Sequence, residues 1–201
     1  MIAIIDYKLG NPGSVFNMLK YLGYESEITF NRERILLADR LILPGVGSFD
    51  AGIQNLRKLE LFEVLNEKVL NDKTPVLGIC LGMQLMGSSS EEGQESGLEW
   101  IRGRSVRFDP GKVRVPHITW NEITIKSGVG LFKDLDSNLK FYFAHSFHFV
   151  PEDEEMVIAK ASYGNSFVGG VENGKILGVQ FHPEKSHKFG MKLLRNFISE
   201  Y

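Results

Sequence analysis

The sequence has a single cysteine, so no disulfide can form within it. It also has no apolar run near the roughly 18 to 20 residues that a membrane-spanning helix needs. Its first residues, MIAIIDYKLG, lack the basic start and the long apolar core of a secretory signal peptide. These absences favour a reducing compartment, no membrane association and a cytoplasmic location.

A strong excess of either charge is missing as well. Lysine and arginine total 23 and aspartate and glutamate total 25, which gives a formal net charge of -2. Such a balance offers no electrostatic case for binding nucleic acid, so small molecules and proteins are the expected partners. Residues 1–201 are predicted to form one domain, because this length suits a single hydrophobic core.

In the first half, short apolar runs alternate with amphipathic stretches. The runs at residues 2–5, 41–43 and 76–79 are typical of strands that are buried on both faces. Between them, apolar residues recur at helical spacing from Val15 to Leu22 and from Ile53 to Val69. This alternation predicts a parallel α/β sheet whose ligands bind beyond the carboxyl ends of the strands.

The second half has a different pattern. Alternating or aromatic runs at residues 105–108, 141–143, 156–161 and 167–171 are typical of antiparallel strands. Asn173 and Gly174 stand between two strand-like runs and predict a tight hairpin. Residues 188–200 then predict a closing amphipathic helix. The predicted fold class is α/β, with a central mostly parallel sheet flanked by helices and an added antiparallel section.

The lone cysteine stands where a predicted strand ends, in the stretch PVLGICLGMQ at residues 75–84. Gly78 and Gly82 lie two residues either side of Cys80, which is the spacing of a nucleophile elbow with sulfur in place of a hydroxyl. A sharp turn would expose the thiol, and the following helix N-terminus would favour its anion. The alternative is a buried structural cysteine, which is what most lone cysteines are.

A thiol nucleophile needs a base and a group that orients the base. His182 ends an apolar strand in GVQFHPEKS, and Pro183 fixes the backbone so that Glu184 can turn back towards the imidazole. The alternative is a surface histidine beside a solvated glutamate. The glycine-rich PGVGSF at residues 44–49 offers backbone N–H groups for an oxyanion, or is only a tight turn in which glycine relieves strain.

PGVGSF, GICLGMQ and GVQFHPEKS, in this order, resemble the class I (triad-type) glutamine amidotransferases, and the likeness covers essentially the whole chain. DYKLGNPGSV, VPHITWNEI and YFAHSF are similar more narrowly to the glutaminase subunits of imidazole glycerol phosphate synthases. The resemblance implies that L-glutamine is hydrolysed through a γ-glutamyl thioester and that the ammonia passes to a partner enzyme. No cofactor and no metal are expected.

The resemblance also assigns roles by position in these motifs. It makes Cys80 the nucleophile, His182 the general base and acid, and Glu184 the residue that orients His182. It implies that the oxyanion is held by backbone N–H groups of Leu81 and of the turn at Val46 and Gly47. It places the glutamine pocket at Gly47, Gln84, His145, Ser146 and Phe147, the last three of which core packing could also explain.

In that family the glutaminase docks on the mouth of a (β/α)8-barrel synthase as a heterodimer. The resemblance implies a docking face that includes Asn11, His117, Trp120, Asn121 and Lys185. The basic residues Lys185, Lys188, Lys192 and Arg195 recur at helical spacing and predict one basic stripe, which a solvated helix face explains equally well. Two residues depart from the family's pattern in these segments, namely Thr119 in place of a usual glycine and Pro12 in the first loop.

Several readings of function stay open at this point. Histidine biosynthesis is the leading pathway, and a paralogous subunit that supplies ammonia to a sugar or polysaccharide pathway is the first alternative. A stand-alone γ-glutamyl hydrolase or a cysteine peptidase-like protein of the same fold would use the same nucleophile without a docking face. A catalytically idle binding subunit is disfavoured, because Cys80, His182 and Glu184 are all intact.

Overall fold

A computed structural model describes residues 1–135 and 139–201, in which the strands form two sheets. The larger sheet has the order β2-β1-β3-β4-β12-β11-β10-β7-β8. Its strands are β1 (Ile2–Ile5), β2 (Ser26–Thr29), β3 (Arg40–Gly45), β4 (Val76–Cys80), β7 (His117–Ile125), β8 (Lys140–His145), β10 (Val157–Tyr163), β11 (Asn165–Asn173) and β12 (Ile176–Val179). The smaller sheet contains β5 (Ser89–Ser90), β6 (Gly103–Arg107) and β9 (Phe147–Pro151).

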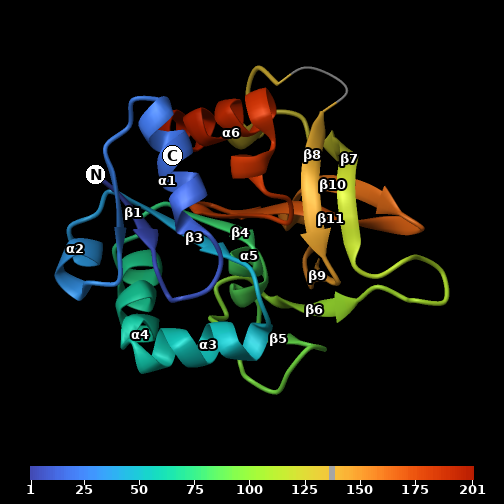
Figure 1. The fold of residues 1–201 in the computed structure, drawn as a ribbon, viewed down its shortest axis with the longest axis horizontal. Helices are drawn as coiled ribbons and strands as arrows, with labels where there is room; N and C mark the ends of the chain where they lie inside the picture. The colour runs from blue at the N-terminus through green and yellow to red at the C-terminus, as the bar shows by residue number, and fades with distance from the viewer. Residues whose placement is uncertain (136–138) are drawn as a thin grey trace.

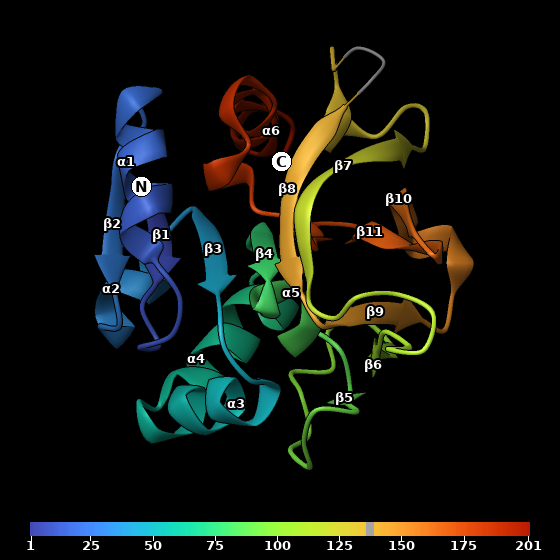
Figure 2. The same ribbon diagram turned by 45° about the vertical axis from the view of Figure 1, so that its right-hand side comes forward.

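The larger sheet has a parallel half and an antiparallel half, which lie side by side in Figures 1 and 2. Strands β2, β1, β3, β4 and β12 pair in parallel, whereas β11, β10, β7 and β8 pair antiparallel. Strand β12 joins the halves, because it pairs in parallel with β4 and antiparallel with β11. The predicted fold class is confirmed, and so is the hairpin at Asn173 and Gly174, where Gly174 has a φ of 61°.

Helices cover both faces of the parallel half. In Figure 1, α1 (Pro12–Tyr21) and α6 (His187–Glu200) lie above the sheet, and α3 (Phe49–Lys58), α4 (Leu61–Asn66) and α5 (Leu81–Leu85) lie below it. A short helix, α2 (Arg32–Leu36), follows β2. Alternate residues of β3 serve two hydrophobic cores, since Leu41 and Leu43 pack into one and Ile42 into the other. Among the described helices, none is long and apolar enough to cross a membrane.

The segment from Ile53 to Val69 departs from the single helix that its apolar spacing predicts. It forms α3, α4 and a π-helical turn, η1 (Glu67–Asn71). The break lies at Glu60, whose φ of 58° is left-handed. Leu56 and Leu61 are both buried but stand five residues apart, so a continuous helix could not turn both towards the same core.

Four elements carry too little pattern to be predicted from sequence. Strand β2 has one buried residue among four, and α2 spans only five residues. Strand β7 has mostly exposed residues, and β9 is a short strand in the small sheet. Periodicity arguments need a sustained buried face, which these elements lack.

Candidate active site

Cys80 lies at the junction of β4 and α5, in the strand–turn–helix context that its flanking glycines predict. Its φ of 53° and ψ of -107° are strained values for a residue with a side chain. A Cβ on Gly82 would lie 1.7 Å from the Leu43 carbonyl oxygen, and one on Gly78 would lie 2.6 Å from Met86 Cε. Gly82 is therefore required for α5 to approach β3, and Gly78 is required because a Cβ there would also lie 2.8 Å from the backbone of Gly82.

Beside this junction, His182 and Glu184 form a buried pair. Their Nδ1 and Oε1 atoms are 2.8 Å apart, and the two side chains are 2% and 7% exposed. Because a carboxylate accepts, Nδ1 carries a proton, and within the described ranges the buried Nε2 has no hydrogen-bond partner. Burial by itself would lower the pKa of His182, but the charges of Cys80 and then Glu184 outweigh it and raise the pKa to about 10.

The segment that carries His182 is held by contacts on two sides. The His182 N–H donates to the Tyr142 carbonyl at 2.9 Å, and the buried Ser186 hydroxyl donates to the His182 carbonyl at 2.6 Å. A Cβ on Gly190 would lie 1.8 Å from the Pro183 carbonyl oxygen, so α6 packs directly against the turn. Pro183–Lys185 forms a 3-10 turn, η4, which brings the carboxylate back to the ring as the sequence predicts.

A cavity of about 320 Å³ opens next to the sulfur. Its walls include Cys80 and every residue predicted for the oxyanion and glutamine sites: Val46, Gly47, Leu81, Gln84, His145, Ser146 and Phe147. These residues come from the ends of β3, β4 and β8, from α5 and from the start of β9. The structure thus brings together residues that are up to about a hundred positions apart in the chain.

Gln180 is a site residue that motif reasoning missed. The register of β12 against β4 pairs Val179 with Ile79, which sets Gln180 beside Cys80. Gln180 is fully buried, and its amide Nε2 donates to Cys80 Sγ at 3.6 Å. Its Oε1 accepts from Gln84 Nε2 at 3.1 Å. A polar side chain within the apolar run ILGVQF is the signal that could have identified it.

The predicted oxyanion turn follows β3 directly. Val46 is 49% exposed, and Gly47 has a φ of 135°, a value that suits only glycine. Beneath the turn lies the buried Tyr7 hydroxyl, which occupies the space where a Gly45 side chain would stand. Burial, and then the negative charge of Cys80, raise the pKa of Tyr7 well above its usual value.

The predicted docking residues occupy different environments. Asn11 is exposed and caps α1, with its Oδ1 accepting from the Ser14 N–H at 3.3 Å. Trp120 is 42% exposed, and its ring stacks on His187 with a centroid separation of 5.3 Å. Lys185 is exposed and its Nζ lies 5.5 Å from the centre of the Tyr142 ring.

The other predicted docking residues are less exposed or lie on another element than expected, and their docking role stays a prediction. His117 is fully buried in the free chain, because strand β7 turns it inwards while Ile118 faces out. Asn121 is half-buried and donates to the Ser162 carbonyl at 2.8 Å. Lys185 belongs to η4 rather than to α6, so it lies outside the predicted stripe on that helix.

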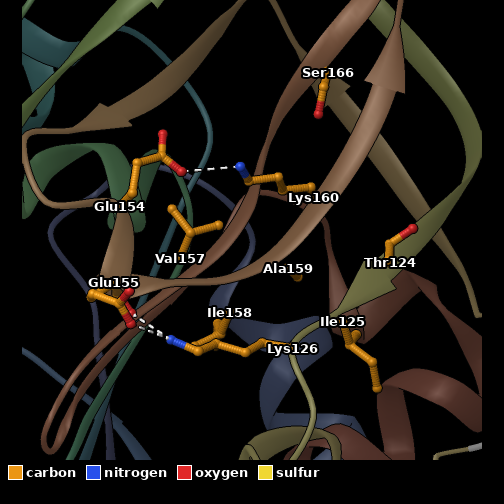
Figure 3. A pocket seen from close by; sticks show the side chains of 10 residues that line it. All are labelled: Thr124, Ile125, Lys126, Glu154, Glu155, Val157, Ile158, Ala159, Lys160 and Ser166. Carbon is orange, nitrogen blue, oxygen red and sulfur yellow. Dashed lines mark hydrogen bonds and ion pairs between the residues drawn. The ribbon is translucent and has the colours of Figure 1, made fainter.

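A larger hollow, of about 530 Å³, lies elsewhere in the antiparallel half (Figure 3). Two ion pairs flank its apolar floor, Lys126 with Glu155 and Lys160 with Glu154, each 3.0 Å long. No cysteine or histidine lines it. In the part of the chain that the structure describes, no cluster of acidic, histidine or cysteine side chains has the arrangement to hold a metal ion.

Comparisons with known proteins agree with this geometry. The model of the family "Glutamine amidotransferase class-I" matches residues 3–201. "Imidazole glycerol phosphate synthase subunit HisH 2" of Methanococcus maripaludis is 49% identical over 201 residues, which is 100% of both chains. The protein of the same description from Pseudomonas aeruginosa is 47% identical over 199 residues, 98% of each chain.

Solved structures show the same fold at lower sequence similarity. A crystal structure described as that of a glutamine amidotransferase superposes with a TM-score of 0.74 at 19% identity, over 98% of this chain and 96% of that one. The structure of PurLQS from Thermotoga maritima gives a TM-score of 0.74 at 18% identity, over 99% and 97% of the two chains.

Proposed function

The chain belongs to the class-I glutamine amidotransferases, and from this premise we propose that it is the glutaminase subunit of an imidazole glycerol phosphate synthase, acting in histidine biosynthesis. Its substrate is L-glutamine, and its partner is a (β/α)8-barrel synthase subunit that receives the ammonia. The observation that carries the proposal is the cavity that joins Cys80 to all the predicted pocket residues, with the His182–Glu184 pair next to Cys80.

In the first half-reaction the Cys80 sulfur attacks the side-chain amide carbon of glutamine. A thiolate is the reactive form, and a protonated His182 is its counter-ion, in agreement with the raised pKa of that imidazole. The C–N bond breaks as His182 Nε2 gives its proton to the departing nitrogen, which leaves as ammonia. The product on the enzyme is a γ-glutamyl thioester.

In the second half-reaction water replaces the sulfur. His182 Nε2, now neutral, takes a proton from the water as the oxygen attacks the thioester carbonyl. The C–S bond then breaks, glutamate leaves, and the thiolate with its imidazolium partner is restored. Throughout, Glu184 holds Nδ1 at 2.8 Å and so keeps Nε2 directed at the reacting atoms.

Both half-reactions pass through a tetrahedral oxyanion, which needs donors aimed at it. We assign this role to the backbone N–H groups of Leu81 and of the turn at Val46 and Gly47, because all three residues line the cavity beside Cys80. Gln84 and the segment of His145, Ser146 and Phe147 then form the remaining walls that hold glutamine.

The surroundings of the cavity mouth support the proposed partner. Ile118 lines the cavity and is 59% exposed, and Trp120, on the same strand, is 42% exposed. Together with Val46, these two residues form an apolar rim that is exposed to solvent in the free chain. Apolar and aromatic side chains of this kind are usual at the centre of a protein interface. A barrel seated on this rim would receive ammonia as it leaves Cys80.

The test uses the purified chain with and without the barrel subunit. We expect glutamine hydrolysis that the barrel accelerates, and we expect Cys80→Ala to abolish hydrolysis while the complex still uses added ammonium. Full activity that is indifferent to the barrel would favour a stand-alone γ-glutamyl hydrolase. Stimulation by a barrel from a sugar-modifying pathway, but not by the histidine-pathway barrel, would move the chain to that pathway.

A further inference from the structure

His117 and His145 form a buried pair that the proposed mechanism does not use. The antiparallel register of β7 and β8 sets them directly opposite each other. The His117 Nδ1 and His145 Nε2 atoms are 2.9 Å apart, and the two residues are 0% and 6% exposed. Such a short contact between two imidazoles requires one ring to donate and the other to accept.

The direction of this hydrogen bond follows from the neighbouring atoms. His145 Nδ1 lies 2.7 Å from the Phe147 carbonyl oxygen, which can only accept, so Nδ1 carries the proton. In a neutral ring His145 Nε2 is then the acceptor, and His117 Nδ1 must be the donor. This leaves His117 Nε2 as an acceptor, and the amide Nδ2 of Asn121 faces it at 3.4 Å. All three bonds therefore point the same way, from Asn121 inwards to Phe147.

The surroundings of the two rings favour their neutral forms. The aromatic rings of Phe108, Phe143, Tyr163 and Phe167 lie within 6.1 Å of one or both imidazoles, centre to centre. The titratable groups that face His145 from other elements are His117 of β7, His148 of β9 and His182 after β12, and a positive charge on any of them disfavours one on His145. Burial is the main reason that the pKa falls to about 4 for His117 and to about 3 for His145.

The inner end of this chain of bonds reaches the glutamine cavity. The Phe147 carbonyl accepts a second hydrogen bond, from Gln84 Nε2 at 2.9 Å. Gln84 in turn bonds to Gln180, which donates to Cys80 Sγ. Because both Phe147 and Gln84 line the cavity, any change at the Phe147 carbonyl alters the wall that holds the substrate.

We propose that His117 is a positioning residue for glutamine binding, acting through His145 as a neutral, one-directional relay that fixes the Phe147 carbonyl and the Gln84 amide. The relay begins at Asn121 on strand β7. The residue before it, Trp120, is exposed and belongs to the predicted docking face. The inference rests on the proposed glutaminase function for its kinetic consequence, whereas the tautomers and charge of the two rings are independent of that function.

The relay itself is tested by long-range proton–nitrogen NMR correlation of the wild-type chain labelled with ¹⁵N-histidine. We expect two histidines to be neutral, protonated on Nδ1, and unchanged between pH 7 and pH 5. The variants H117N and H145N assign the signals. Protonation of either ring on Nε2, or an imidazolium at either position at pH 7, would overturn the relay even if the glutaminase assay succeeds.

The positioning role is tested by kinetics of two substitutions in the complex with the barrel. H117F keeps a ring of similar volume but removes the donor, so the KM for glutamine should rise about tenfold, as expected for one lost buried hydrogen bond, with kcat within about twofold. H117N keeps a donor near the place of Nδ1 and should restore most of the affinity. Equal effects of the two variants would mean that His117 acts only by packing. A lower kcat at unchanged KM would mean that His117 acts in the transition state and would overturn a role in glutamine binding.

His148→Phe is the matched control. His148 is a partly buried histidine whose ring packs on Phe108 with a centroid separation of 4.7 Å, and it belongs to neither the relay nor the cavity wall. Its replacement should leave the KM for glutamine within about twofold of wild type. A tenfold rise of the KM for glutamine in H148F would show that loss of any histidine packed among these aromatic rings disturbs the pocket. That result would contradict a specific relay through His117.

Discussion

Single charges in the candidate site set its acid–base chemistry. His182 is buried, and yet its pKa is raised to about 10, because the charges of Cys80 and Glu184 outweigh the effect of burial. Glu184 also fixes which ring nitrogen carries the first proton, at an Nδ1–Oε1 distance of 2.8 Å. The carboxylate therefore has an electrostatic effect and an orienting effect on His182. Replacing it with an uncharged side chain of the same shape can separate the two effects.

Glu184→Gln makes this separation. Loss of the negative charge should lower the pKa of His182, so the alkaline limb of the pH profile of kcat/KM should move to lower pH. The same change removes a stabilising pair, whose contribution is present below pH 6.5 and is lost as the pH rises towards 10. Steady-state rates and urea unfolding from pH 7 to pH 10 measure the two effects. An unshifted alkaline limb in E184Q would contradict the assignment of that limb to His182.

At the level of single residues, the sequence allows a good prediction of which side chains the fold brings together at the candidate site. Cys80, His182 and Glu184 stand in short motifs whose local geometry is decided by the glycines and the proline beside them. The contact of Gln180 with Cys80 and the inward turn of His117 could not be predicted in the same way, although a polar residue in an apolar run marks Gln180 as unusual. Both depend on the pairing of strands distant in the chain, namely β12 with β4 and β7 with β8.

Among the elements, the close approach of α5 to β3 holds Cys80, the proposed nucleophile, in place. Gly82 lies at the contact, where a Cβ would be 1.7 Å from the Leu43 carbonyl oxygen. Backbone atoms cannot move aside as a flexible side chain can, so the helix itself would have to shift. A shift of α5 would carry Leu81, whose N–H we assign to the oxyanion, away from its place beside Cys80.

Gly82→Ala should therefore destabilise the fold by about 3 kcal/mol, at the upper end of the usual cost of overpacking, and should lower kcat as well. Gly169→Ala is the matched control, because a Cβ there would lie 3.6 Å or more from its neighbours in an equally buried strand. Urea unfolding and glutamine hydrolysis of both variants provide the comparison. Equal stability of G82A and G169A would refute the tight contact.

The elements themselves were predictable where a buried face is sustained over several residues. Strands β1, β3 and β4 and helix α6 are of this kind, and each lies within a few residues of its predicted range. The break at Glu60 is marked in the apolar spacing only by the five-residue step from Leu56 to Leu61, because α3 and α4 otherwise both present apolar residues at helical spacing to the same core. Strand β2 and helix α2 are fixed mainly by neighbours in the tertiary structure.

In the molecule as a whole, the site lies where the parallel and antiparallel halves meet. Cys80 ends β4 in the parallel half, and His145 ends β8 in the antiparallel half. Strand β12 joins the two, and His182 follows it directly. The protonation of histidines at the site should therefore affect the stability of the whole fold, and this effect can be measured by unfolding at different pH values.

The chain should lose stability as the pH falls below about 6.5. Unfolded histidines bind protons near that pH, whereas His117 and His145 stay neutral in the fold until about pH 4 and about pH 3. Between pH 7 and pH 5, each should contribute a loss of about 1 to 2 kcal/mol. Urea unfolding of the wild type and of H117F at both pH values isolates one of these contributions. The same pH dependence in both proteins would contradict a neutral His117.

Whether Cys80 is the nucleophile for glutamine is tested by labelling the wild-type complex with a glutamine-analogue electrophile, followed by peptide mass spectrometry. We expect a single adduct on the peptide that contains Cys80, suppressed by glutamine and absent from Cys80→Ala, whose glutaminase activity is also lost. An adduct at any other residue that glutamine suppresses equally, or glutamine hydrolysis that survives Cys80→Ala, would contradict this role of Cys80.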